Sequence, residues 1–519
     1  MVWLDGSSLT LEALDRIAHH GESVGLAPDA ASRVRASRAV VDRHAARGTP
    51  VYGVNTGFGA LAEVAIPADQ LARLQLNLLR SHAAGVGEPL PVPAVRALIA
   101  LRANVLAKGF SGIRIETLEA LIALLNAGVH PRVPSRGSVG ASGDLAPLAH
   151  LALVLVGEGE VENDIGSRFT EQLKRLPMSF QPAAGALARA GLQPVTLAAK
   201  EGLALINGTQ ASTAELALAV LAAERLARAA DIAAAMSVDA LRGSFHPYEA
   251  RIHAARPVPG QAASADNLWR LGAGSAINKS HENCGRVQDA YAMRCAPQVH
   301  GSAREAIAFA RRLAEIEANS ATDNPMVFVD EGEGEIVSGG NFHGAPIALA
   351  ADTLAIGLAQ LTTISERRLD RLLTSAESGL PPFLVTASGI NSGLIMAQVT
   401  AAALTSEIKT LAHPAAADTI PTSAGREDHV SMSMGAALKA ARIVDLATFV
   451  VAVELLAACQ AIDLLAPLTT SAPLARVHRG VREHVPVLTT DRPPAPDIER
   501  VASMIASGAI EAAGDLNLR

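Results

Sequence analysis

Residues 436–465 read AALKAARIVDLATFVVAVELLAACQAIDLL and form the longest apolar segment of the chain. A membrane span needs about 20 apolar residues in a row. This stretch is interrupted instead by the charged residues Lys439, Arg442, Asp445, Glu454 and Asp463. It therefore predicts a long helix that is buried on most sides within a bundle.

Comparable helical patterns cover residues 211–236, 346–373 and 398–411. Such lengths exceed the usual three to four turns. Alanine-rich faces let helices approach closely, and a helix of about 30 residues is roughly 45 Å long. A stack of such helices would leave apolar sides exposed on each chain. We therefore expect a homo-oligomer with the bundles packed side by side.

The composition also favours helices. The 519 residues are 49 % apolar but include only 10 Phe, 2 Trp and 3 Tyr, and roughly one residue in five is Ala. Ala, Leu, Glu and Arg are strong helix formers, whereas strand-rich cores depend on β-branched and aromatic residues. The sequence thus predicts a mainly α protein with a long central helix bundle.

Charge and cysteine content exclude several classes. The net charge is −7 and no Lys/Arg block is present, which argues against binding to nucleic acid or to a membrane surface and favours a small neutral or zwitterionic ligand. Cys284, Cys295 and Cys459 have no paired spacing, so neither a disulfide framework nor a zinc site is expected. The absence of a basic and apolar leader at the N-terminus fits a protein of the reducing cytoplasm.

The first half of the chain is divided by Gly/Pro turns at residues 53–59, 85–93 and 129–134. Residues 256–266 (RPVPGQAASAD) predict a mobile loop. Because binding and catalytic residues concentrate on loops, these segments are where chemistry is sought.

The most unusual segment is SRGSVGASGDLAPLAH, residues 135–150. Its glycines allow a tight turn, and the simplest interpretation is a turn before a helix capped by Asp144. A phosphate loop is disfavoured because neither GxxxxGK[ST] nor GxGxxG is present. A third interpretation is chemical. The Gly143 nitrogen can close onto the Ala141 carbonyl carbon, and loss of water from the ring and from Ser142 would leave an electrophilic methylidene on an imidazolone.

This segment resembles the cofactor-forming loop of the aromatic amino acid lyase family, in which Ala-Ser-Gly becomes 4-methylideneimidazole-5-one (MIO). The resemblance covers nearly the whole chain, and its histidine-directed members are the most similar. It includes VYGVNTGFG (51–59), SHAAGVGEPL (81–90), AKEGLALINGTQAS (199–212), VQDAYAMRCAPQVHG (287–301), ATDNPMVF (321–328), SGGNFHG (338–344) and REDHVSM (426–432).

The resemblance implies a fold of the fumarase/aspartase-like superfamily. It implies an N-terminal domain over residues 1–200 that carries the MIO loop, a central long-helix bundle over 201–465 and a C-terminal helical segment over 466–519. It also implies that MIO forms autocatalytically from Ala141, Ser142 and Gly143, with no metal or nucleotide. It implies a homotetramer in which several subunits build each active site.

Two tyrosines lie in the matching motifs. Tyr52 could pack a loop, but the resemblance makes it the base that removes the substrate β-proton; a catalytic phenolate needs a cation or donors that lower its pKa. Gln288, Tyr291 and Arg294 recur every three residues, so a helical turn would present them on one face. That face could be a solvated stripe. The resemblance instead gives Arg294 a bidentate contact with the substrate carboxylate and places Tyr291 and Gln288 beside it.

Two further residues receive roles in the same way. Asn207 would by default form an Asn-Gly turn with Gly208. The resemblance places its side chain at the substrate carboxylate and the imidazolone oxygen, a role comparable to that of an oxyanion-hole donor. Phe342 is a typical core residue, and in the family this Phe lines the cavity beside the cofactor.

Substrate choice depends on His82 and Glu427. The pair Ser81-His82 resembles the histidine-directed group, whereas phenylalanine- and tyrosine-directed relatives usually have Leu at the second position. Glu427 could be a surface carboxylate. An anion is costly beside a phenyl ring but can accept a hydrogen bond from an imidazole N–H. Gly425-Arg426 and Ile395 depart from the histidine-directed pattern; Arg426 could pair with Glu427 or contact an added anionic group.

The expected reaction is elimination of ammonia from L-histidine to give trans-urocanate, with Tyr52, Ser142, Tyr291 and Glu427 as catalytic residues. Two alternatives use the same chemistry. One is a lyase or an aminomutase that acts on phenylalanine or tyrosine, and the other is a lyase that acts on a modified histidine such as ergothioneine. A different class would be a catalytically silent helical scaffold, which the intact Ala-Ser-Gly triplet disfavours.

Overall fold

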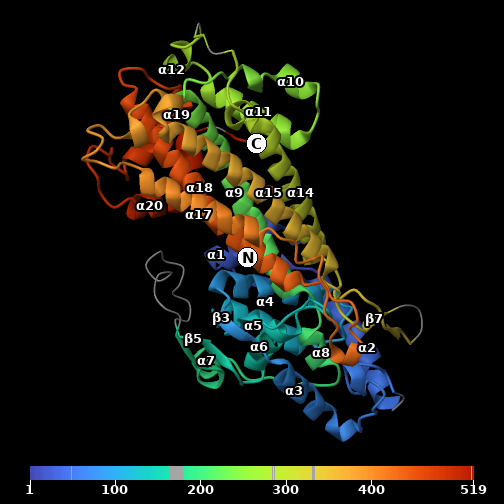
Figure 1. Cartoon of the computed structure of the whole chain (residues 1–519). Coiled ribbons are helices and arrows are strands. Elements are labelled where there is room, and N and C mark those ends of the chain that lie inside the picture. Colours follow the sequence, from blue (N-terminus) through green and yellow to red (C-terminus); the bar gives the residue numbers. More distant parts are fainter. Residues whose placement is uncertain (48–49, 164–178, 283, 286, 330–332, 516) are drawn as a thin grey trace. The chain divides into compact units, whose positions relative to one another are not determined.

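The structure is a computed structural model that describes residues 1–47, 50–163, 179–282, 284–285, 287–329, 333–515 and 517–519. Its chain forms two compact units (Figure 1). Unit 1 consists of residues 1–218, 311–351 and 414–438, and unit 2 of residues 219–310, 352–413 and 439–519. The fold is mainly helical, as the composition predicts. The division into three domains stays a prediction.

Four long helices contribute residues to both units: α9 (Gln210–Ala240), α14 (Ala296–Ala318), α15 (Ala345–Leu373) and α18 (Ser433–Leu464). Three of them, α9, α15 and α18, confirm predicted long helices, and α17 (Ile395–Leu411) confirms the fourth; α14 was not predicted. α15 and α18 are long and apolar enough to cross a membrane, but 61 % and 83 % of their most apolar windows are buried inside the protein. Such burial is typical of core helices.

Within unit 2 the long helices are joined by buried polar contacts. The Glu454 carboxylate on α18 accepts hydrogen bonds from Ser237 on α9 and from Ser365 and Arg368 on α15. Small residues bring α14 and α15 together: a Cβ added at Gly357 would lie 2.6 Å from the Ala306 Cβ. The other helices of this unit are α10 (Ala250–Ala254), α11 (Pro259–Gly272), α12 (Ala276–Lys279), α13 (Tyr291–Arg294), α16 (Ser375–Ser378), α19 (Ala472–Arg482), α20 (Ala495–Ala506) and α21 (Ala509–Gly514).

The loop predicted over residues 256–266 is wrong from Pro259 onward, because α11 begins there. Proline is well suited to the first turn of a helix, where its missing N–H costs nothing. Gln261, Ser264 and Ala265 are then buried against the unit. Ser264 donates to Asp231 at 2.7 Å, so a tertiary contact stabilises a segment whose local sequence resembles a loop.

Unit 1 packs short helices around two central ones, α4 (Val92–Ala107) and α6 (Leu145–Leu155), which are buried along most of their lengths. The described strands form four two-stranded pairs in this unit: β1 (Val2–Leu4) with β2 (Val24–Leu26), β3 (Val86–Pro89) with β4 (Pro134–Arg136), β5 (Glu160–Glu162) with β6 (Phe180–Pro182), and β7 (Met326–Phe328) with β8 (Glu335–Val337). The first pair is parallel and the others are antiparallel. The other helices are α1 (Leu11–His20), α2 (Pro28–Arg47), α3 (Leu71–His82), α5 (Ile115–Asn126), α7 (Ala183–Arg189) and α8 (Glu201–Ile206).

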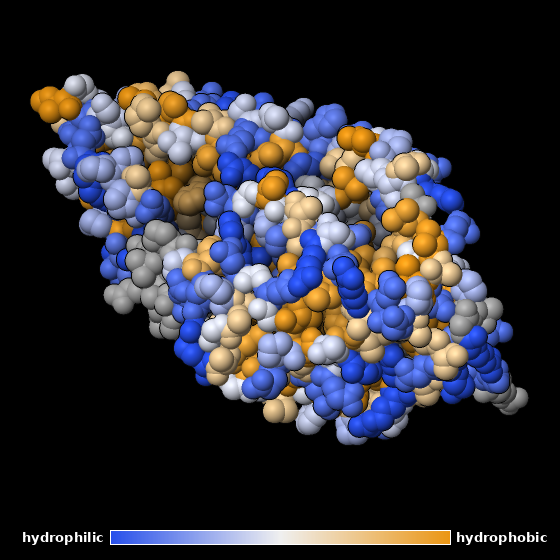
Figure 2. All heavy atoms as spheres, turned by 90° about the horizontal axis from the view of Figure 1, so that it is seen from below, coloured by the Kyte–Doolittle hydropathy of each residue, from blue (hydrophilic) through white to orange (hydrophobic). Residues whose placement is uncertain are grey.

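Several large apolar side chains are exposed on the helices. Ile356 on α15 is 43 % exposed, and Met396 and Val399 on α17 are 61 % and 51 % exposed. Figure 2 shows one face of the molecule, on which apolar areas alternate with hydrophilic side chains.

Candidate active site

The Ala141-Ser142-Gly143 triplet lies between β4 and α6, and both of its ends are anchored. On the N-terminal side, the Gly140 carbonyl accepts hydrogen bonds from the Ser431 hydroxyl at 2.8 Å and the Gly344 amide at 3.2 Å. On the C-terminal side, the Asp144 amide donates to the Gly208 carbonyl at 2.7 Å. The triplet is therefore held between three segments that are far apart in the sequence.

Asp144 does not cap α6 with its side chain, as the simplest interpretation of the segment expected. Its fully buried carboxylate instead accepts hydrogen bonds from the Ser138 hydroxyl and from both the amide and the hydroxyl of Ser212, at 2.7–2.8 Å. Burial raises the pKa of the Asp144 carboxyl, and these donors oppose that shift. The contacts join the loop to the first turn of α9.

Gly143 has no room for a side chain. Its φ of +72° lies in the left-handed region, and a Cβ would stand 2.2 Å from the Gly208 carbonyl oxygen. Glycine alone tolerates both conditions. This close approach, which also pairs Gly143 with Gly208 as an isolated bridge, fixes the backbone on one side of Ser142.

Asn207 directly follows α8 and is almost fully buried. Its Nδ2 donates to the Ser142 carbonyl oxygen at 2.9 Å. Its Oδ1 is buried and accepts no hydrogen bond from the residues that the structure describes. The side chain is thus positioned by one contact to the triplet and has an acceptor left for a further partner.

A cavity of about 300 Å³ opens above Ser142 within unit 1. Five of the predicted site residues line it: Tyr52, His82, Ser142, Asn207 and Glu427. The rest of the lining is largely apolar and was not predicted: Phe58, Gly59, Leu61, Leu78, Leu145, Leu203, Ile206, Asn324 and Ser423. Several of these residues lie within the matching motifs, which is the signal that could have indicated them.

Glu427 faces Ser142 across the cavity. The Ser142 hydroxyl donates to Oε1 at 3.3 Å, and the Thr422 hydroxyl donates to Oε2 at 2.5 Å. Thr422 and Glu427 also pair through their backbones. Arg426 is exposed and, in the described part of the chain, forms no ion pair with Glu427. Thr422 therefore positions the Glu427 carboxylate. Thr422 was not predicted as a site residue, because neither its sequence neighbours nor its spacing from other polar residues indicates this role.

His82 ends α3 and directs its Nδ1 toward the Leu78 carbonyl oxygen at 2.9 Å. Because a carbonyl only accepts, Nδ1 carries the hydrogen and Nε2 is an acceptor in the neutral ring. Burial lowers the pKa of His82, although the Leu78 carbonyl and Glu427 oppose this shift. Burial therefore favours the neutral form of the His82 ring.

Tyr52 is half-buried and meets the Phe58 ring edge to face, with centroids 6.5 Å apart. Burial raises the pKa of its phenol, and the Glu427 charge raises it further, while a hydrogen bond with the Gly59 backbone opposes both. No Lys or Arg is among the described residues that line the cavity. The described lining of the cavity thus contains no cation that would lower the pKa of this phenol.

The remaining predicted residues do not line this cavity. Phe342 lies in the turn before α15 and is half-buried. Gln288, Tyr291 and Arg294 belong to unit 2, where Tyr291 is 71 % exposed and the Arg294 guanidinium lies 4.6 Å from the centre of its ring. Only Tyr291 and Arg294 share the helical turn α13, since Gln288 precedes it.

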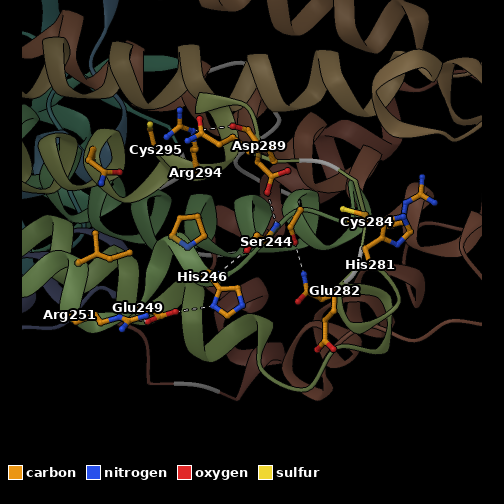
Figure 3. A pocket seen from close by; sticks show the side chains of 18 residues that line it. Ser244, His246, Glu249, Arg251, His281, Glu282, Cys284, Asp289, Arg294 and Cys295 are labelled. Atoms are coloured by element: carbon orange, nitrogen blue, oxygen red, sulfur yellow. Dashed lines mark hydrogen bonds and ion pairs between the residues drawn. The ribbon is translucent and has the colours of Figure 1, made fainter.

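Gln288 and Arg294 line an open hollow of about 850 Å³ within unit 2 (Figure 3). Asp289 fixes the wall of this hollow: its carboxylate accepts from the Ser244 amide at 2.6 Å, and its carbonyl accepts from Arg294 Nε at 3.1 Å. Among the contacts of the described residues, Arg294 uses its Nε for this bond and places its guanidinium over the Tyr291 ring. Among the described residues no group of three or more His, Cys, Asp or Glu side chains is suited to hold a metal ion.

The fold and the site define a class of enzyme, and the chain belongs to the aromatic amino acid lyase family, whose sequence model matches residues 9–483. Members of this family use MIO. The chain is 55 % identical to the histidine ammonia-lyase of Anaeromyxobacter sp. (strain K), over 98 % of this chain and 99 % of that protein.

Solved structures agree with this assignment. The crystal structure of histidine ammonia-lyase from Trypanosoma cruzi is 46 % identical, with a TM-score of 0.89 over 99 % of this chain and 94 % of that one. The tyrosine aminomutase of Streptomyces globisporus is 38 % identical, with a TM-score of 0.92 over the whole of both chains. Fold similarity alone therefore does not separate histidine from tyrosine as the substrate.

Proposed function

We propose that the chain eliminates ammonia from L-histidine and releases trans-urocanate. The observation that carries this proposal is the position of His82 and Glu427 in the cavity above Ser142. An ionised Glu427 is unfavourable beside a phenyl or phenol ring but accepts a hydrogen bond from an imidazole N–H. His82 Nε2 offers a second acceptor in the same cavity.

The local geometry fits MIO formed from Ala141, Ser142 and Gly143. The backbone is held tightly on both sides of the triplet, and Gly143 leaves the ring-closing nitrogen unobstructed by a Cβ. Asn207 Nδ2 already donates to the Ser142 carbonyl oxygen, which would become the imidazolone oxygen. MIO supplies an electrophile, which no ordinary side chain provides, to convert the amine into a leaving group.

The residues of the cavity divide the remaining work. Tyr52 takes the β-proton of the substrate, and Glu427 orients the imidazole ring. Thr422 keeps Glu427 in place through its hydroxyl and backbone contacts. Asn207 stabilises negative charge at the carbonyl oxygen of residue 142, as a preorganised oxyanion-hole donor does.

The site is completed by Arg294, Tyr291 and Gln288 of another copy in a homotetramer, with Phe342 beside the cofactor. Two observations support this arrangement. The cavity contains a carboxylate but, in its described lining, no Lys or Arg to bind the substrate carboxylate. Exposed apolar side chains such as Met396 and Val399 also call for a partner surface. A guanidinium delivered to the cavity would lower the pKa of Tyr52, as the catalytic role requires.

A tyrosine aminomutase activity is the second candidate, because the Streptomyces globisporus enzyme of that name has the same fold over its whole length. A substrate panel separates the two. Purified protein is incubated with L-histidine, L-tyrosine, L-phenylalanine and ergothioneine, and products are followed by ultraviolet absorbance and chromatography. Urocanate from histidine supports the proposal; turnover of tyrosine without histidine would replace it. The proposal also includes a cytoplasmic location, which cell fractionation tests.

A further inference from the structure

A fully buried arginine lies behind the Asn207-Gly208 segment. Arg102 on α4 donates through Nη1 to the Asn207 carbonyl at 2.9 Å and through Nε to the Ala204 carbonyl at 3.1 Å, with a further contact from Nη2 to the same oxygen. Nη1 also donates to Gln210 Oε1 at 2.6 Å. One side chain thus joins the end of α8 to the first residue of α9.

Burying the charged Arg102 guanidinium costs free energy, so its contacts must compensate for that cost. Its side chain is 0 % exposed, and burial lowers the pKa of its guanidinium to about 10. A buried guanidinium stabilises a structure only when its donors are satisfied in fixed directions. Here most of those directions are set by backbone carbonyls of one short segment, which ends at Asn207.

That segment is the surface against which the triplet is held. Asn207 Nδ2 binds the Ser142 carbonyl, and the Gly208 carbonyl binds the Asp144 amide at 2.7 Å. A Cβ at Gly208 would lie 2.5 Å from Arg102 Nη1, so the guanidinium is packed directly behind this glycine. A shift of Arg102 would therefore move both bonds that position Ser142 and Gly143.

We propose that Arg102 is a positioning residue that holds the Asn207-Gly208 segment in place for ring closure of Ala141-Ser142-Gly143 and, afterwards, for turnover. Arg102 contacts none of the reacting atoms and acts through Asn207 and Gly208. The proposal rests on the proposed function, because it assumes that the triplet cyclises.

Arg96 provides a matched control. It lies on the same helix, is 2 % exposed, and burial lowers its pKa to about 10 as well. Its guanidinium donates to the Ile17 carbonyl at 2.8 Å and the Leu125 carbonyl at 3.2 Å, neither of which lines the cavity. Arg96→Lys therefore reproduces the general cost of replacing a buried arginine on α4.

The test compares Arg102→Lys, Arg102→Gln and Arg96→Lys in the full chain. A lysine keeps the charge but presents its donors from a single point and cannot span the carbonyls of Ala204 and Asn207 together. Each variant is made by cell-free synthesis, and intact mass is followed over time for the loss of two water molecules. Folding is checked by circular dichroism, and kcat and KM for L-histidine are measured on matured protein.

We expect both Arg102 variants to fold and to mature at least about tenfold more slowly than the wild type. Their kcat per matured chain is expected to be about tenfold lower or more, because small misplacements of reacting groups have effects of this size. Arg96→Lys is expected to stay within about twofold of the wild type in both. Equal maturation and kcat in the Arg102 and Arg96 variants would overturn the proposal. So would unfolding of both Arg102 variants, which would assign Arg102 to the general fold. A wild type that loses no water would contradict the proposed cofactor itself.

Discussion

The side-chain amide of Asn207 donates a hydrogen bond of 2.9 Å to the carbonyl oxygen of Ser142, while the Asn207 Oδ1 is buried without a described partner. The donor is therefore in place in the chain before any substrate arrives. Preorganised donors of this kind act on charge that develops in the transition state and need no rearrangement during the reaction.

Replacing Asn207 by Ala removes this donor and is expected to lower kcat for L-histidine by roughly 100- to 1000-fold, the usual range for an oxyanion-hole donor. Steady-state kinetics measure the loss. Intact mass shows whether the triplet has still lost two water molecules, which separates an effect on turnover from one on maturation. A variant with wild-type kcat would rule out a role for this amide.

Activity is expected to rise with pH between about pH 7 and about pH 9, because the proposed base Tyr52 must be deprotonated. Burial and the Glu427 charge raise the pKa of its phenol, so only a small fraction is deprotonated at pH 7. Glu427→Gln removes the nearby negative charge. Its residual activity should therefore rise at lower pH than that of the wild type. Profiles of kcat/KM against pH check this shift. A profile displaced to higher pH would contradict the placement of Glu427 beside Tyr52.

Two inactive variants are expected to restore activity when they share an oligomer. Tyr52→Phe removes the base from the cavity in unit 1, and Arg294→Lys removes the guanidinium from unit 2. If each site takes these residues from different copies, random mixing leaves about a quarter of the sites with both intact. Co-expression followed by an activity assay measures this recovery.

The control for that experiment is the double variant, Tyr52→Phe with Arg294→Lys in one chain, co-expressed with itself. It should stay inactive. Co-expression of the two single variants without any recovery would show that both residues come from the same copy, and the shared-site arrangement would have to be abandoned.

A buried histidine makes stability depend on pH. His300 Nδ1 lies 2.7 Å from Asp231 Oδ1, and Arg304 binds the other oxygen of the same carboxylate. Burial and the Arg368 charge lower the pKa of His300, although Asp231 and Glu454 oppose them. The unfolded chain then binds a proton near pH 6.5 that the folded chain does not, so stability is full at higher pH and falls as the pH drops toward the folded pKa.

We therefore expect the unfolding temperature to decrease between about pH 7 and about pH 5, and to decrease less in His300→Gln. Differential scanning calorimetry at several pH values measures both slopes. His82 and His150, whose pKa values burial also lowers, contribute in the same direction and leave some slope in the variant. A variant as pH-dependent as the wild type would exclude His300 as a source.

The sequence could predict the parts of this protein that have local signals. The apolar length and the interrupting charges of residues 436–465 indicate α18, and the matching motifs indicate the triplet, Asn207 and Glu427. Arg102 has no such signal, because an arginine in an apolar helix is usually expected to extend to water. Its role depends on carbonyls about a hundred residues away in the chain.

The loop predicted over residues 256–266, most of which belongs to α11, was wrong for the same reason: contacts distant in the sequence decide its structure. Its small and polar residues have weak local preferences, and the helix α11 depends on contacts such as that of Ser264 with Asp231. Thr422 also escaped prediction, because its importance comes from pairing with Glu427 across a turn. Tertiary contacts, which a single sequence does not display, decide these positions.

The proposed ammonia-lyase activity is tested most directly by measuring ammonia and trans-urocanate together during incubation with L-histidine. Wild-type protein is predicted to form them in equal amounts, and its intact mass should be lower than the sequence mass by two water molecules. Ser142→Ala should form neither product while its circular dichroism stays that of the wild type. Equal turnover by Ser142→Ala, or no urocanate from a folded wild type, would contradict the proposed MIO-dependent histidine ammonia-lyase activity.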